Sequence, residues 1–265
     1  MLLMEDVIEN AGAETQIYLT IVNDIIYDEE LSSLKDIEIL KRLFSKKAIM
    51  ENHIEQIISL TKESGADGLE IDYEAIKKLK PLWKAFVTFV NKLSKRADEE
   101  GIPLRIILEP NALDQVTFPQ GPEYVIMCYN QFGMHSSTPG AKASPEFIQE
   151  IIEKSRELPG KVTLAFATGG FDWSEDGTIK EVTETSALAL LDKFGSAANR
   201  DKTSGAVVFN YVDETGTAHE VWYADGTTIL TWIETARESG ITDFALWRFG
   251  GNSETSLAEI RDGLQ

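Results

Sequence analysis

The chain alternates between short apolar runs rich in β-branched and aromatic residues and longer segments with helical spacing. Nearly continuous apolar strands of this length are typical of a parallel sheet that is covered by helices on both faces. Glycines such as Gly65, Gly101 and Gly240 follow the helical segments, at positions where a helix end favours a left-handed residue. The pattern predicts an α/β fold built from helix, glycine turn and strand. The expected strands are Ile17 to Val22, Gly68 to Tyr73, Leu104 to Leu108, Tyr124 to Tyr129, Val162 to Phe166 and Phe244 to Phe249.

The strand pattern predicts a TIM (β/α)8-type barrel that lacks its first two strands. A chain of 265 residues has the length of one α/β barrel. A closed barrel of this type needs about eight strands, and the apolar runs fall two short of that number. We therefore expect the missing pair upstream of Met1, and a helix from Leu3 to Ala11 that leads into the strand at Ile17. One hypothesis is an N-terminally truncated gene product with an open barrel, whose exposed strand edges favour aggregation or dimerisation.

One segment interrupts the alternation. Residues Ala206 to Tyr223 show two strand patterns around a turn at Asp213 to Gly216, which predicts a β-hairpin inserted before the last barrel strand. The sequence has no internal repeat and no low-complexity linker. We therefore expect a single domain over residues 1–265, with the inserted hairpin at residues 206–223.

Composition excludes several kinds of partner. The 25 basic and 44 acidic residues give a formal net charge of −19, which repels nucleic acid and anionic membrane surfaces. No long apolar run predicts membrane insertion, and the N-terminus has no signal-peptide pattern. The single cysteine, Cys128, excludes an intrachain disulfide, and it leaves the compartment and the oligomeric state open. The scattered histidines His53, His135 and His219 lack metal-ligand spacing, so we expect no metal site.

The stretch DGLEIDYE, residues 67–74, carries the strongest functional signal. Glu70, Asp72 and Glu74 follow at a spacing of two, and a strand directs such residues to the same face. Since like charges this close cannot all ionise freely, at least one carboxyl group is expected to have a raised pKa and to donate a proton near neutral pH. The alternative is a solvated acidic strand, but Leu69 and Ile71 indicate an interior strand, where inward acids are costly without a function.

This stretch resembles glycoside hydrolase family 18, whose fourth barrel strand carries the pattern DxxDxDxE. Asp67, Glu70, Asp72 and Glu74 occupy the four acidic positions, with Glu70 in place of an aspartate. The resemblance implies substrate-assisted, retaining hydrolysis of β-linked N-acetylglucosamine glycans, without a metal or organic cofactor. In that chemistry Glu74 protonates the glycosidic oxygen, Asp72 orients the 2-acetamido group of the substrate, and Asp67 and Glu70 tune Asp72.

Further matches carry the resemblance beyond the acidic strand. MCYN, residues 127–130, is similar to the family's Met-x-Tyr-Asp with asparagine at the last position, which implies that Tyr129 donates a hydrogen bond to the acetamido oxygen and that Asn130 contacts a sugar hydroxyl. ALWRFG places Trp247 where the family has the floor of the sugar site. A tyrosine or tryptophan in the core is the alternative for Tyr129 and Trp247.

Three residues have weaker support. Trp173 follows the expected strand at Val162 to Phe166, the seventh strand of a complete barrel, and either serves a neighbouring sugar subsite or packs a loop. Glu109 and Asn111, in LEPNA, are expected at the same barrel mouth as the acids, where they either touch substrate or cap a loop.

The segments HEVWYADGTTI from His219 and QFGMHSSTPGAKAS after Asn130 resemble the spore-cortex-lytic branch of the family, which cuts peptidoglycan after N-acetylglucosamine. The resemblance therefore implies a glycosidase that acts on peptidoglycan or a chitin-like glycan, at an extracellular, cell-surface or spore-surface location. The alternative is a catalytically weak or inactive, lectin-like glycan-binding protein. Asn130 and the missing strands favour that alternative, whereas the presence of Glu74, Asp72 and Tyr129 disfavours it.

Overall fold

The computed structural model describes residues 2–26 and 32–264 of the chain. The chain divides into two compact units. The first contains residues 1–126 and 155–162, and the second contains residues 127–154 and 163–265.

The first unit is a parallel sheet covered by helices. Its strands lie in the order β1 (Tyr18–Val22), β4 (Gly68–Asp72), β5 (Leu104–Leu108) and β6 (Glu123–Met127). All of these pairings are parallel. The expected strands are confirmed, with ends that differ by one or two residues because a strand ends where its ladder of backbone hydrogen bonds ends.

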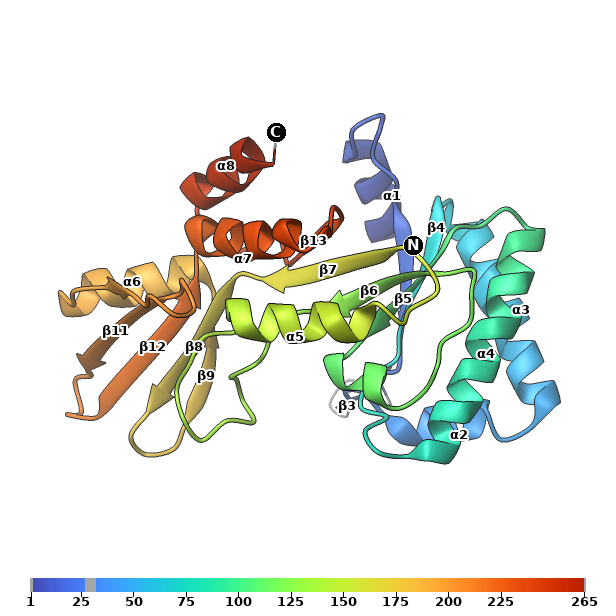
Figure 1. Cartoon of the computed structure of the whole chain (residues 1–265), viewed down its shortest axis with the longest axis horizontal. Helices are drawn as coiled ribbons and strands as arrows, with labels where there is room; N and C mark the ends of the chain where they lie inside the picture. Colours follow the sequence, from blue (N-terminus) through green and yellow to red (C-terminus); the bar gives the residue numbers. More distant parts are fainter. Residues whose placement is uncertain (1, 27–31, 265) are drawn as a thin grey trace. The chain divides into compact units, whose positions relative to one another are not determined.

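Helices α3 (Lys47–Ser64) and α4 (Lys80–Glu99) lie side by side in this unit (Figure 1). Their apolar faces are buried, as their helical spacing predicts. Helix α3 ends at Gly65, whose φ of 73° is the left-handed conformation expected at a helix end. The remaining elements of the unit are α1 (Leu2–Asn10), β2 (Ile25–Ile26), β3 (Ser32–Ser33), α2 (Ile37–Leu43) and the 3-10 helix η1 (Pro110–Asp114).

The second unit contains two further parallel strands, β7 (Val162–Ala167) and β13 (Phe244–Trp247), which pair with each other. Its other described strands form an antiparallel sheet in the order β10 (Asn199–Arg200), β11 (Val207–Val212), β12 (Ala218–Ala224), β8 (Gly169–Ser174) and β9 (Ile179–Val182). The helices of this unit are α5 (Pro145–Ser155), α6 (Glu184–Phe194), α7 (Gly226–Glu238) and α8 (Glu254–Gly263).

The predicted hairpin is part of this antiparallel sheet. Strands β11 (Val207–Val212) and β12 (Ala218–Ala224) pair as expected, and β12 also pairs with β8 (Gly169–Ser174). The other two strands are β9 (Ile179–Val182) and β10 (Asn199–Arg200). Strands β8 and β9 were not expected, since two glycines begin β8 and charged residues occupy β9. Strands β9, β11 and β12 share a buried core with α6.

In the part of the chain that the structure describes, none of the helices combines the length and the apolar character needed to cross a bilayer.

Candidate active site

The side chains of strand β4 alternate between the two faces of the sheet. Leu69 and Ile71 are completely buried, whereas Glu70 and Asp72 point to the other face of the sheet and are partly exposed. The hydroxyl of Thr20, which is paired with Glu70 in the register of β1 and β4, donates a hydrogen bond of 2.8 Å to Glu70 Oε1. The sheet therefore holds two of the predicted acids on one face.

Glu74 follows β4 and is positioned by the chain around it. Tyr73 anchors this segment, since its ring is 5% exposed and its hydroxyl lies 2.7 Å from Nε2 of His53 in α3. The backbone N–H of Glu74 donates to Asn23 Oδ1 at 2.9 Å, and Asn23 Nδ2 donates to the carbonyl of Glu74 at 3.2 Å. These contacts fix the backbone of Glu74, whose side chain is 14% exposed.

Two further charged groups complete the cluster. Lys35 Nζ lies 2.6 Å from Glu74 Oε2. Glu109 follows β5, and one of its carboxylate oxygens accepts a hydrogen bond of 3.1 Å from the N–H of Ala75. Burial raises the pKa of Glu109, with a further contribution from the charge of Glu74. The first unit thus gathers Asp72, Glu74 and Glu109 near the ammonium group of Lys35, with Glu70 close to Asp72.

Asp72 is the most perturbed of these acids. Burial, followed by the negative charges of Glu74 and Glu70, raises its pKa to about 7. Its Oδ1 atom is buried and has no hydrogen-bond partner among the described residues. A buried, unsatisfied oxygen is costly, and a ligand N–H that donates to it would relieve that cost. The raised pKa of Asp72 agrees with the expectation that at least one carboxyl group of this strand has a raised pKa.

Asp67 lies at the other end of the strand. Its carboxylate accepts a hydrogen bond of 2.8 Å from the backbone N–H of Ile17, at the start of β1. The structure therefore gives Asp67 a contact that joins the starts of two neighbouring strands, while Glu70, Asp72 and Glu74 gather toward the strand end.

The second unit holds the other predicted site residues. Tyr129 is partly buried and Asn130 is exposed, directly after β6, and Asn130 has a left-handed φ of 59°. Trp247 ends β13 with 49% of its surface exposed, and it borders a pocket of about 250 Å³ together with Lys142 and Thr168. An exposed indole beside a pocket is suited to stacking against a sugar ring.

Trp173 lies in strand β8, which follows β7 in the chain. The side chain is 5% exposed, and its indole N–H donates to the carbonyl of Ser136 at 3.1 Å. It also borders a pocket of about 450 Å³ with Asn210 and His219. A role in substrate binding stays a prediction for this residue.

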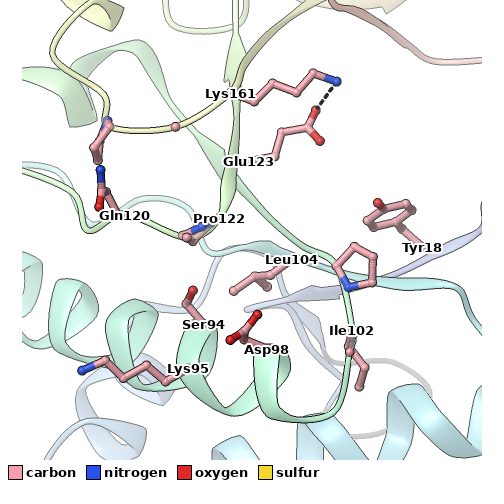
Figure 2. A pocket seen from close by; sticks show the side chains of 15 residues that line it. Tyr18, Ser94, Lys95, Asp98, Ile102, Leu104, Gln120, Pro122, Glu123 and Lys161 are labelled. Carbon is pink, nitrogen blue, oxygen red and sulfur yellow. Dashed lines mark ion pairs between the residues drawn. The ribbon is translucent and has the colours of Figure 1, made fainter.

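A cavity of about 840 Å³ lies elsewhere in the first unit, at the starts of β5 and β6 (Figure 2). Tyr18, Leu104 and Glu123 line it, and Lys161 Nζ lies 3.9 Å from a carboxylate oxygen of Glu123. The clustered acids stand at the opposite ends of the strands, where parallel α/β folds place their sites. We therefore assign the candidate site by its chemistry and not by the volume of this cavity.

Two residues of the cluster, Asn23 and Lys35, are not predicted from the sequence. Asn23 directly follows β1, so its position at a strand end was a usable signal. Lys35 lies in a loop before α2, and its spacing from the acids in the sequence gives no sign of the contact with Glu74. Among the expected extra residues, Asn111 borders a pocket with Lys77 and Leu79.

Known proteins with similar sequences are named as glycosylases and cortex-lytic enzymes. No protein-family model matches the chain. The uncharacterized glycosylase YvbX of Bacillus subtilis is 28% identical over 257 residues, which cover 91% of this chain and 72% of YvbX. The chain spans half or less of two cortical fragment-lytic enzymes from Bacillus species that it also matches.

Solved structures show the same fold. The spore cortex-lytic enzyme SleL of Bacillus megaterium superposes with a TM-score of 0.82 at 20% identity, over 100% of this chain and 62% of that chain. A chitinase from Chromobacterium violaceum superposes with a TM-score of 0.81 at 16% identity, over 98% of this chain and 83% of that chain. The predicted TIM-barrel type of α/β fold is confirmed, and so is the resemblance to the cortex-lytic branch of glycoside hydrolase family 18. The comparisons support a glycosidase.

Proposed function

We propose that the protein hydrolyses β-linked N-acetylglucosamine glycans, of peptidoglycan or chitin type, by substrate-assisted retaining catalysis. The observation that carries the proposal is the buried, unpartnered Oδ1 of Asp72, on a carboxyl group set between Glu70 and Glu74. This oxygen is suited to accept a hydrogen bond from the N–H of a 2-acetamido group.

Glu74 and Asp72 have different roles in the proposed reaction. Glu74 gives a proton to the bridging oxygen while the acetamido carbonyl oxygen, oriented by Asp72, attacks the anomeric carbon and the glycosidic bond breaks. Glu74 then takes a proton from water, which opens the cyclic oxazolinium intermediate from the opposite side, so the configuration is retained. Since the pKa of Asp72 is about 7, a proton is available beside Glu74 near neutral pH.

The remaining predicted residues are proposed either to support the acidic strand or to contact the substrate. Glu70 and Asp67 support the acidic strand through Thr20 and Ile17. Tyr129 is proposed to donate to the acetamido oxygen, Asn130 to contact a sugar hydroxyl, and Trp247 and Trp173 to border sugar rings.

Glu74→Gln tests the proposal. The amide keeps the shape of the side chain but cannot donate the proton, so kcat on N-acetylglucosamine oligomers is expected to fall by roughly 10²- to 10⁴-fold. Glu63→Gln, on the exposed face of α3, is the matched control and should keep full activity. Turnover is measured by mass spectrometry of the products and their reducing ends. Wild-type rates in Glu74→Gln would overturn the assignment of the acid.

A lectin-like protein is the second candidate, favoured by the short ion pair between Glu74 and Lys35 and by the neutral Asn130. Binding without products, measured for the wild-type protein on the same oligosaccharides, would establish this function instead.

A further inference from the structure

The loop that carries Lys35 is held in place on both sides of this residue. The backbone N–H of Lys35 donates to Asp24 Oδ1 at 2.6 Å, and the N–H of Asp36 donates to the carbonyl of Asn23 at 2.7 Å. Lys35 has a left-handed φ of 53°, which costs free energy for a residue with a side chain and persists only where the surroundings enforce it. Asn23, which clamps this loop, also clamps the backbone of Glu74. The fold therefore fixes Lys35 relative to the proposed acid.

The ammonium group of Lys35 is both charged and accessible. Partial burial lowers the pKa of Lys35, but the hydrogen bond and charge of Glu74, together with Glu109 and Asp72, outweigh it and raise the pKa above its ordinary value. Half of the side chain is exposed to solvent. An ammonium group has three donors, and the acceptor recorded for it among the described residues is Glu74. Lys35 can therefore contact a second acceptor.

The chemistry of the substrate indicates what that acceptor is. Lys35 Nζ lies 2.6 Å from the carboxylate that is proposed to protonate the oxygen bridging two sugars, so its ammonium group is placed to reach a substituent of the leaving sugar near that oxygen. In chitin, C3 of the leaving sugar, which is next to the C4 that carries the bridging oxygen, bears a hydroxyl group. In peptidoglycan the leaving sugar is a muramic acid, and the same carbon bears a lactyl ether that ends in a carboxylate or an amide carbonyl. A lysine ammonium binds either acceptor by a charge-assisted hydrogen bond.

We propose that Lys35 binds the lactyl group of the muramic acid that leaves, and thereby directs the protein to peptidoglycan in preference to chitin. The inference rests on the proposed function, because it takes Glu74 as the acid. Lys35 is thus a specificity-determining residue.

The test compares two substrates in matched variants. Lys35→Met is assayed on a tetrasaccharide of alternating N-acetylglucosamine and N-acetylmuramic acid, and on N-acetylglucosamine tetramer. The kcat/KM ratio of the muramyl substrate to the N-acetylglucosamine tetramer is expected to fall by about 10- to 100-fold, the effect of losing a hydrogen bond to a charged group. Lys35→Arg keeps the cation and should retain most of the preference.

Lys77→Met is the control. Like Lys35, Lys77 has a left-handed φ, here 52°, and its side chain is exposed. Its charge also acts on Glu109. The substitution therefore removes a similar cation while Lys35 stays in place. The ratio should not change in this variant.

Binding of the same two tetrasaccharides, measured by calorimetry, separates the two proposals. Turnover with a ratio that Lys35→Met leaves unchanged would overturn the inference and keep the proposed function. If the wild-type protein hydrolyses neither substrate but prefers to bind the muramyl one in a Lys35-dependent way, the proposed function fails and recognition by Lys35 stands. If the wild-type protein neither hydrolyses nor binds the two tetrasaccharides, both the proposed function and the inference about Lys35 are wrong.

Discussion

Two carboxylic acids at a spacing of two residues differ because their surroundings differ. Asp72 is enclosed among other acids and keeps an unpartnered buried oxygen, whereas Glu74 has a lysine ammonium at 2.6 Å and a clamped backbone. Pairs of acids whose environments differ in this way are the usual basis for dividing acid, base and orienting roles. The different surroundings of Asp72 and Glu74 therefore suit them to different roles, which alternation along the strand alone does not predict.

Asp72 should make the stability of the protein depend on pH. Its pKa is about 7 in the folded protein and has an ordinary value of 3.8, so the folded state binds the proton more tightly than the unfolded state. The resulting stabilisation is fully present below about pH 4 and is lost as the pH rises toward 7 and above. In Asp72→Asn this loss should be absent, so at pH 8 the variant should be more stable than the wild type by ~2–4 kcal/mol relative to their difference at pH 4.

Urea unfolding of both proteins at pH 4 and pH 8 measures this difference. Glycan hydrolysis by Asp72→Asn should fall at the same time, because the amide cannot orient the acetamido group as a carboxylate does. Equal pH dependence in the two proteins would show that Asp72 titrates near its ordinary value.

At the scale of elements, Asn23 joins the end of β1, the end of β4 and the loop before α2. It is 2% exposed, and its amide contacts the backbone of Glu74 on both sides and the carbonyl of Asp36. Asn23→Ala leaves these backbone groups without a partner, so we expect a loss of about 1–3 kcal/mol in the free energy of unfolding and a fall in kcat. Asn91→Ala, on the exposed face of α4, is the control and should be neutral or slightly stabilising.

Thermal unfolding and turnover on the same samples test the Asn23 prediction. An Asn23→Ala variant with wild-type stability and turnover rate would mean that the hydrogen bonds of Asn23 do not position Glu74.

Elements with a strong local pattern were predicted well, and contacts that depend on the fold were not. The nearly continuous apolar run at Leu104 to Leu108 identified β5 to the residue, and DGLEIDYE identified the acidic strand. Strand β8 was missed because Gly169 and Gly170 disfavour a strand assignment. In the sheet, however, Gly170 is required, since a Cβ there would lie 1.7 Å from the carbonyl oxygen of Trp222. Lys35 was missed because its partner is 39 residues away and is set by the clamp at Asn23.

At the scale of the whole molecule, the net charge of −19 acts on the substrate before any contact forms. Peptidoglycan carries carboxylates, so the protein and an acidic glycan repel one another over the Debye length, which is about 30 Å at 0.01 M salt and about 10 Å at 0.1 M. The proposed contact between Lys35 and a lactyl group acts at hydrogen-bond distance, well within a Debye length, so salt weakens it less than the long-range repulsion.

Raising the salt concentration from 0.01 to 0.1 M should therefore increase kcat/KM on the muramyl tetrasaccharide by roughly 2- to 5-fold, through faster association. The uncharged N-acetylglucosamine tetramer is the control, because its rate has no repulsion to relieve and should stay nearly constant. Initial rates at substrate concentrations well below KM measure the effect directly. A rate on the acidic glycan that falls with salt would mean that local attraction at the site, and not the charge of the whole chain, governs its capture.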